Sequence, residues 1–375
     1  MNDHLHIISF DIPYPPDYGG VIDVFYKIRT LSEEGVKIIL HCFEYNRMRA
    51  EILNQYCEKV YYYKRNVSLS AHVSYLPYTV YSRKNTDLIN NLLKDNHPIL
   101  FEGLMSCYYL SDKRLKNRFK IYRESNIEHD YYRELAKATK ILKDRLYLYL
   151  ESVKFRFFEK RLKYADLMLV VSKEDQKQLQ QRFPENKVEY LPSFHPENDI
   201  TSFIGLSDYV LYNGNLGVME NENAAVYLCE NVFSKLTCKC IIAGRNPSGE
   251  LKKVVSQYPN VVLEHDISME RMEELIHNAQ VHMLVTFQGT GLKLKLLNTL
   301  FAGRHVLVNS TMLAGTELAP VCHVADTPDE QVKICGELLH TPFTQADIDK
   351  RKRNLFPQFS NKEQGLRIKN IISTT

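Results

Sequence analysis

The sequence predicts an α/β protein with two doubly wound parallel sheets facing a cleft. Short apolar runs alternate with segments of helical period along most of the chain, the pattern of parallel strands joined by crossover helices. The alternation pauses once, at a polar segment broken by Pro192 and Pro196, and then restarts. A chain of 375 residues is long enough for two domains with separate cores. We therefore expect ligands at the carboxyl ends of the strands.

The first half of the chain is expected to form one domain over residues 1–190. Residues 11–20, rich in proline and glycine, follow the first strand and lead into an amphipathic helix at residues 21–34, which Gly35 ends. The predicted strands are residues 5–10, 36–42, 59–63, 99–102, 120–123 and 167–171.

The second half repeats the pattern after a linker at residues 191–204. A second domain is expected over residues 205–343, and a helical tail at residues 344–375 is expected to pack back on the first domain. The predicted strands are residues 209–213, 238–243, 261–264, 281–285 and 305–308, with helices at residues 222–233, 248–257 and 269–277.

Residues 137–164 are predicted to form one long helix that is both basic and aromatic. Two interpretations are open for it. It is an amphipathic helix that covers a sheet, which we favour, or it lies on an anionic membrane surface.

Composition excludes several classes of function. A net charge of +3 without a long basic block argues against nucleic-acid binding. The cysteines lack metal-ligand spacing, and Cys238 and Cys240 are expected to be small core residues, as in a reducing cytosol. The sequence has neither an N-terminal apolar signal nor an apolar run of about 20 residues, so a cytoplasmic protein is expected.

The most informative segment is the turn Gly289-Thr290-Gly291, which follows an apolar strand and opens a helix. Lys293 and Lys295 fall in the first turn of that helix. Glycines let backbone N–H groups approach a ligand, and a helix start favours negative charge, so the segment indicates a phosphate or diphosphate site. A turn kept for packing, with solvated lysines, explains the same residues.

Five segments in a fixed order carry a resemblance to a known family. They are residues 13–20 (PYPPDYGG), 123–129 (RESNIEH), 165–175 (ADLMLVVSKED), 212–225 (YNGNLGVMENENAA) and 289–303 (GTGLKLKLLNTLFAG). Together they resemble the GT-B retaining glycosyltransferases of the large nucleotide-sugar-dependent group, glycosyl transferases group 1. The resemblance spans nearly the whole chain and implies two Rossmann-like domains. Ser172 and Asp175 in the third segment are expected to cap a helix and to carry no chemistry.

The resemblance also implies site residues. The catalytic positions are Gly19, Gly20, Ser125 and Glu128, and base recognition is expected near residues 265–267. The donor-binding positions are Asn215, Arg245, Gly289, Thr290, Gly291, Leu292, Lys293 and Asn298.

Three positions in or beside these segments depart from the family pattern. Ser125 stands where relatives often carry a histidine that faces the sugar. Asn298 replaces the glutamate that accepts hydrogen bonds from the ribose, and Gln288 stands near a second lost glutamate. An asparagine can still hold a ribose hydroxyl, but less strongly than a carboxylate.

The implied reaction is transfer of a hexosyl unit from a nucleoside diphosphate sugar to a glycan or lipid-linked acceptor, with retention. It implies neither a metal nor a cofactor besides the donor, and a lipid-linked acceptor implies peripheral contact with the inner membrane face. The alternative is a non-catalytic nucleotide-sugar-binding subunit in polysaccharide assembly, which the lost glutamates favour. An epimerase on this fold lacks clear acid–base residues, and a dehydrogenase lacks the G-x-G-x-x-G fingerprint.

Overall fold

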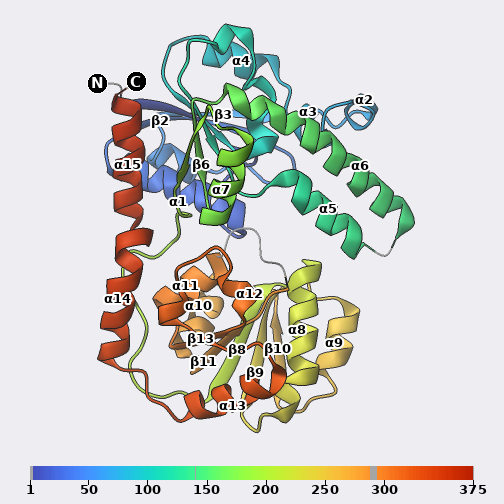
Figure 1. The fold of residues 1–375 in the computed structure, drawn as a ribbon, viewed down its shortest axis with the longest axis vertical. Helices are drawn as coiled ribbons and strands as arrows, with labels where there is room; N and C mark the ends of the chain where they lie inside the picture. The colour runs from blue at the N-terminus through green and yellow to red at the C-terminus, as the bar shows by residue number, and fades with distance from the viewer. Residues whose placement is uncertain (1–2, 140, 288–293, 375) are drawn as a thin grey trace. The chain divides into compact units, whose positions relative to one another are not determined.

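A computed structural model describes residues 3–139, 141–287 and 294–374 of the chain (Figure 1). The chain divides into two compact units. Unit 1 comprises Met1–Phe194 and Asn361–Thr375, and unit 2 comprises His195–Ser360.

Unit 1 is built on a parallel sheet of seven strands in the order β3-β2-β1-β4-β5-β6-β7 (Figure 1). Leu5 and Ile7 of β1 enter one buried core, whereas Ile8 enters the core on the other face, as strand period dictates. The strands are β1 (His4–Ile8), β2 (Lys37–Glu44), β3 (Lys59–Lys64), β4 (Ile99–Glu102), β5 (Lys120–Arg123), β6 (Leu167–Val170) and β7 (Lys187–Tyr190).

Helices cover the sheet of unit 1 and connect its strands. The last helix of the chain packs on the first, and Lys369 Nζ donates a 2.6 Å hydrogen bond to the Glu34 carbonyl. The α-helices are α1 (Gly19–Glu33), α2 (Leu69–His72), α3 (Tyr78–Tyr81), α4 (Thr86–Leu92), α5 (Glu128–Ala138), α6 (Leu142–Phe158), α7 (Lys173–Arg182) and α15 (Asn361–Ser373). The 3₁₀ helices are η1 (Glu51–Gln55), η2 (Leu104–Tyr109), η3 (Lys113–Leu115) and η4 (Glu159–Tyr164).

Unit 2 repeats this architecture with six parallel strands in the order β10-β9-β8-β11-β12-β13. The strands are β8 (Tyr209–Asn215), β9 (Lys239–Arg245), β10 (Val261–His265), β11 (Val281–Leu284), β12 (His305–Val308) and β13 (His323–Val324). The helices are α8 (Met219–Asn231), η5 (Phe233–Lys235), α9 (Gly249–Val255), α10 (Met269–Asn278), α11 (Leu294–Ala302), α12 (Ser310–Leu313), η6 (Ala319–Val321), α13 (Pro328–Leu339) and α14 (Gln345–Phe359).

The predicted fold class is confirmed, since both sheets are parallel and doubly wound in the GT-B manner. Gly35 ends α1 with a φ of +82°, a conformation that favours glycine. Ser172 caps α7 by accepting a 3.0 Å hydrogen bond from the Asp175 amide, as predicted. Strands β7 and β13 were not predicted, because β7 is a polar edge strand and β13 has two residues.

The prediction of one helix over residues 137–164 is wrong at its start, because residues 137–138 end α5, whereas residues 142–164 are helical as predicted. The structure has the hairpin of α5 and α6, followed by η4. Thr139 leaves the helical conformation with ψ 124°, and its Oγ1 donates a 2.7 Å hydrogen bond to the Leu135 carbonyl, which closes α5. Phe155 and Phe158 at the end of α6 join the core, whereas most of the helix before them is exposed.

Within the described residues we find no helix with the length and hydropathy that a bilayer crossing requires.

Candidate functional site

The strand orders fix where each unit can bind a ligand. In unit 1, β2 and β3 are added on one side of β1, and the chain then crosses to the other side of β1 to form β4. In unit 2, β9 and β10 are added on one side of β8, and β11 forms on the other side. The strand order therefore reverses between β1 and β4 and between β8 and β11. Ligands of doubly wound sheets bind outside the carboxyl ends of the strands at such switch points. The predicted residues lie on these edges, because Gly19 and Gly20 follow β1, Ser125 and Glu128 follow β5, and Asn215 and Arg245 end β8 and β9.

In unit 1, three of the loops at this edge meet around Phe10. A Cβ atom on Gly20 would lie 2.7 Å from Phe10 Cζ, so any larger residue there would displace the ring. The position of a Cβ on Gly103 lies 3.6 Å from Phe10 Cδ1 and 3.7 Å from Ser125 Oγ. The structure thus brings Gly20 and Ser125 to one place, and Gly20 has a packing role whether or not a ligand binds.

Glu128 is buried in the first turn of α5. Burial raises its pKa from 4.5 to about 8; the Glu159 carboxylate adds to this shift and Arg83 opposes it. A carboxylate at a helix start is ordinarily favoured by the helix dipole, so here desolvation outweighs the dipole. Glu128 therefore carries a proton at neutral pH and can donate a hydrogen bond.

Glu124 is a second buried carboxyl group beside Ser125, and the sequence analysis gave it no role. Its Oε2 accepts a 3.4 Å hydrogen bond from the Val171 amide, while its Oε1 is buried without a partner among the described residues. Burial, together with the nearby Asp175 carboxylate, raises its pKa well above the ordinary range. The available signal was an acidic residue directly after a four-residue buried strand.

A buried cluster of four charges lies beneath this edge. Lys27 Nζ contacts Asp23 Oδ2 at 2.9 Å and Glu102 Oε1 at 2.8 Å. Arg123 Nε contacts Asp23 Oδ2 at 3.2 Å, and its guanidinium also donates to the Leu191 carbonyl at 2.5 Å. The cluster links α1, β4 and β5 to Leu191, the residue that follows β7. Its two positive and two negative side chains have no net charge.

In unit 2, the loops after β8 and β9 interlock. Asn215 and Arg245 are paired in the sheet register, and the Gly217 amide donates to Asn215 Oδ1 and to the Arg245 carbonyl, each at 3.1 Å. A Cβ on Gly244 would lie 1.9 Å from the Gly214 carbonyl oxygen, so only glycine fits. The side chains of Asn215 and Arg245 are both exposed at this edge.

Lys295, in the first turn of α11, is the cation that the structure places at the switch point. Its Nζ donates to Asn221 Oδ1 at 2.9 Å and lies 4.7 Å from the centre of the Tyr212 ring. A Cβ on Gly214 would lie 3.1 Å from the same Nζ. Lys295 was predicted in the first turn of this helix, but the resemblance implied Lys293 for donor binding.

Asn298 lies one helical turn beyond Lys295, on the same face of α11. Its Oδ1 is buried and has no hydrogen-bond partner among the described residues. A buried acceptor without a partner is costly, and this one fits the predicted role of holding a hydroxyl group. The other residues predicted from this segment lie outside the described residues: Gln288, Gly289, Thr290, Gly291, Leu292 and Lys293.

Two loop residues beside Arg245 adopt the left-handed conformation. Asn246 and Asp266 each have a φ of 55°, which is uncommon outside glycine. Asp266 Oδ1 accepts a 3.1 Å hydrogen bond from the Asn246 amide, and Asp266 Oδ2 lies 2.8 Å from His265 Nδ1. These bonds hold the exposed loops after β9 and β10 together, where base recognition was predicted.

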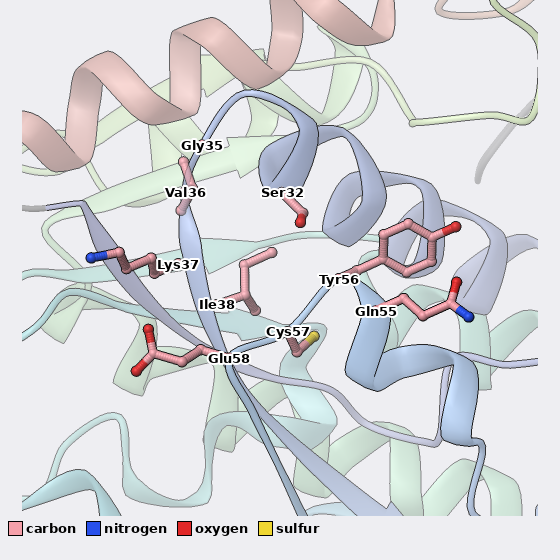
Figure 2. A pocket seen from close by; sticks show the side chains of 9 residues that line it. All are labelled: Ser32, Gly35, Val36, Lys37, Ile38, Gln55, Tyr56, Cys57 and Glu58. Atoms are coloured by element: carbon pink, nitrogen blue, oxygen red, sulfur yellow. The ribbon is translucent and has the colours of Figure 1, made fainter.

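A hollow of about 300 Å³ lies elsewhere in unit 1 (Figure 2). It is bounded by the end of α1, the start of β2 and the segment that follows η1, with Ser32, Lys37 and Tyr56 among its lining residues. It is therefore at the amino end of the sheet, opposite the edge that carries the predicted residues. Ligand binding there is not expected from the topology.

In the described part of the chain, no three histidine, cysteine, aspartate or glutamate side chains gather as metal ligands.

Comparisons with known proteins agree on the fold. No family model matches the chain. An uncharacterised 44.6 kDa protein in the cps region of Klebsiella pneumoniae is 25% identical over 331 residues, which cover 83% of this chain and 84% of that protein.

Solved structures similar to this chain include S. aureus TarM in complex with UDP and Anabaena HepE in complex with UDP and glucose. TarM superposes with a TM-score of 0.68 and 10% identity over 99% of this chain and 100% of TarM. HepE superposes with a TM-score of 0.66 and 9% identity, again over 99% and 100% of the two chains. A UDP-forming trehalose-phosphate synthase from Burkholderia xenovorans gives a TM-score of 0.64 at 9% identity over 99% of each chain. At these identities the similarity shows a shared GT-B fold.

Proposed function

We propose that this protein is a retaining glycosyltransferase that moves a hexosyl unit from a nucleoside diphosphate sugar to a glycan or lipid-linked acceptor. The observation that carries the proposal is the carboxyl edge of unit 2, where Lys295 lies over Gly214 at the switch point. Asn298 Oδ1, which has no hydrogen-bond partner among the described residues, lies one turn away. Because TarM, HepE and the trehalose-phosphate synthase have this fold and are named with UDP, uridine diphosphate sugars are the first donors to test.

The donor's diphosphate gains negative charge as its bond to the anomeric carbon breaks. Lys295 and the exposed Arg245 are the described cations of unit 2 that we assign to this charge. Lys293 and the amides of Gly289-Thr290-Gly291 keep the role that the sequence predicts for them. With this positive charge supplied by the protein, we propose that transfer needs no divalent metal.

The acceptor hydroxyl must lose a proton as its oxygen bonds to the anomeric carbon. Glu128, with a pKa of about 8, is protonated at neutral pH and cannot take it. Burial raises the pKa of Glu124 well above its ordinary range, so we do not assign the proton to that group either. We assign that proton to an oxygen of the departing diphosphate. In this proposal the two carboxyl groups of unit 1 act as hydrogen-bond donors near Ser125, Gly19 and Gly20.

The proposal is tested by thermal unfolding with UDP, other nucleoside diphosphates and their sugars, together with an assay of donor hydrolysis. A selective stabilisation by one nucleotide is expected for the native protein and is expected to disappear in Lys295→Met. Lys235→Met is the matched control, because Lys235 pairs with Asp329 on the surface, away from the strand ends. Stabilisation by a nucleotide sugar without hydrolysis or transfer would favour the alternative of a non-catalytic binding subunit. No stabilisation by any donor would contradict both the transferase and the binding subunit.

A further inference from the structure

Helix α6 presents an apolar stripe to solvent. Leu142, Leu146, Leu150, Val153 and Phe157 recur at steps of three or four residues, so they lie on one face of the helix. The exposed fractions are 79% for Leu142, 58% for Leu146 and 64% for Phe157. A stripe of this length on a surface helix indicates a partner.

The opposite face of α6 is fixed to the rest of unit 1. Glu151 Oε2 accepts a 2.7 Å hydrogen bond from the Tyr78 amide, and Ser152 Oγ donates at 2.7 Å to the His129 carbonyl. Phe155 and Phe158 are buried in the core. Since these contacts set the rotation of the helix, the apolar stripe lies on the face of α6 that points away from the core of unit 1.

Basic residues border the stripe on both sides. At 100° per residue, Lys143 falls on one flank, and Arg145 and Arg156 fall on the other. All three are exposed, and Lys160 follows at the end of the helix. Of the two acidic residues on α6, Glu151 is buried and Asp144 lies on the far side from the stripe. The exposed face is therefore apolar in the middle and positively charged at its edges.

A neighbouring segment adds to this surface. Lys154 Nζ lies 3.5 Å from the His72 carbonyl, which places the residues after α2 beside α6. Val73 and Tyr75 in that segment are 84% and 81% exposed. Tyr149 of α6 is exposed as well, and tyrosine is favoured where an apolar layer meets water.

We propose that α6 is a docking helix for an anionic lipid surface, with its apolar stripe inserted at the level of the headgroups. The flanking cations select this occupant, because anionic headgroups neutralise them while the stripe enters the acyl boundary. A second copy of the chain is disfavoured, since a symmetric pairing of the stripes would bring the same cations together.

Docking through α6 would hold the candidate edge of unit 1 close to the membrane. Helix α5 leads from Glu128 to the hairpin turn in 11 residues, which is about 16 Å of helix. If the proposed function holds, an acceptor tethered to a lipid could then reach Ser125 and Glu128. The docking itself does not depend on that function.

The test is co-sedimentation of the full chain with vesicles of phosphatidylcholine alone and with vesicles containing equal parts of phosphatidylcholine and phosphatidylglycerol. The native protein is expected to sediment with the anionic vesicles, and less so at high salt. The double variant Leu146→Glu with Phe157→Glu should stay in the supernatant, and Arg145→Glu with Arg156→Glu should bind at least about tenfold more weakly. Met48→Glu, which changes an exposed apolar residue of unit 1 outside the stripe, should bind like the native protein.

Three results would overturn the proposal. They are failure of the native protein to sediment with anionic vesicles, equal binding to both vesicle types, and self-association that the Leu146→Glu with Phe157→Glu pair abolishes. Hydrolysis of a water-soluble donor should be unchanged in every α6 variant, so failure of docking and failure of the proposed function are distinguishable. The variants change exposed residues, and unfolding temperatures equal to that of the native protein would show that they fold.

Discussion

The carboxyl edges of the two sheets share a topology but differ in how they treat polar groups. In unit 1, the ionisable residues at and beneath the edge are buried, as Lys27, Arg123, Glu124 and Glu128 show. In unit 2, Asn215, Arg245, Asn246 and Asp266 are exposed at the equivalent edge. The buried charges of the Lys27 cluster satisfy one another and fix a shape, whereas the polar groups of unit 2 lie at the surface, where a ligand can reach them. This difference is the reason we propose that unit 2 binds the charged donor and that unit 1 positions a neutral hydroxyl acceptor.

The largest effect is expected from breaking the buried cluster of unit 1. Lys27→Met would leave Asp23 and Glu102 buried without their shared cation, and should lower the free energy of unfolding by about 3–5 kcal/mol. Lys37→Met, which removes an exposed ion pair with Asp3, should cost at most about 1 kcal/mol. Denaturant unfolding measures both. Adding Glu102→Gln to Lys27→Met should restore part of the lost free energy of unfolding. A double variant that is no more stable than Lys27→Met would show that the charges act independently.

The second prediction concerns the pH dependence of unit 1. Because the pKa of Glu128 is raised in the folded protein, its contribution to stability is complete below its ordinary 4.5 and falls as the pH rises through about 8. Glu128→Gln should remove this fall, which is at most about 5 kcal/mol for a pKa raised from 4.5 to about 8. The measurement is the unfolding temperature of the native protein and of the variant between pH 5 and pH 9 in identical buffers. Parallel curves for the two proteins would mean that Glu128 is ionised throughout.

A smaller effect on the free energy of unfolding is expected in unit 2. It should have opposite signs when Asn298 and Asn309 are each replaced by leucine. Asn298→Leu removes a buried acceptor that has no partner in the described part of the chain, and it should raise stability by about 1 kcal/mol while weakening nucleotide binding. Asn309→Leu is the control, because Asn309 Nδ2 donates to the Thr286 carbonyl at 2.7 Å and its Oδ1 accepts from the Thr286 amide at 3.2 Å. That variant should lose about 1–3 kcal/mol. Thermal unfolding with and without UDP separates the two effects, and a loss of stability in Asn298→Leu would contradict the assignment.

The smallest effect is expected at the exposed loops of unit 2. Asn246→Gly suits the φ of 55° and should change stability by less than about 1 kcal/mol in either direction. The loop would become more flexible, so nucleotide affinity measured by calorimetry should fall even though the protein remains folded. An unchanged affinity would indicate that this loop does not contact the donor.

The fold could be predicted almost entirely from the sequence, and the site only in part. Strands 99–102, 120–123 and 305–308 were predicted to the residue, because each is a short, wholly buried run between polar loops. The break at Thr139 was missed, because residues on both sides keep the same basic and aromatic character. At the site, the resemblance located the strand ends correctly, but the pKa of Glu128 and the orphan oxygens of Glu124 and Asn298 arise from three-dimensional burial that no local pattern encodes.

The most direct test of the account is amide hydrogen exchange of the full chain with and without UDP. We predict protection in the peptides that cover residues 213–221 and 244–247 of unit 2, none around the hollow at the start of β2, and loss of the protection in Lys295→Met. Protection confined to unit 1, or protection in unit 2 that survives the substitution, would contradict the assignment of the donor to Lys295 and the loops beside it.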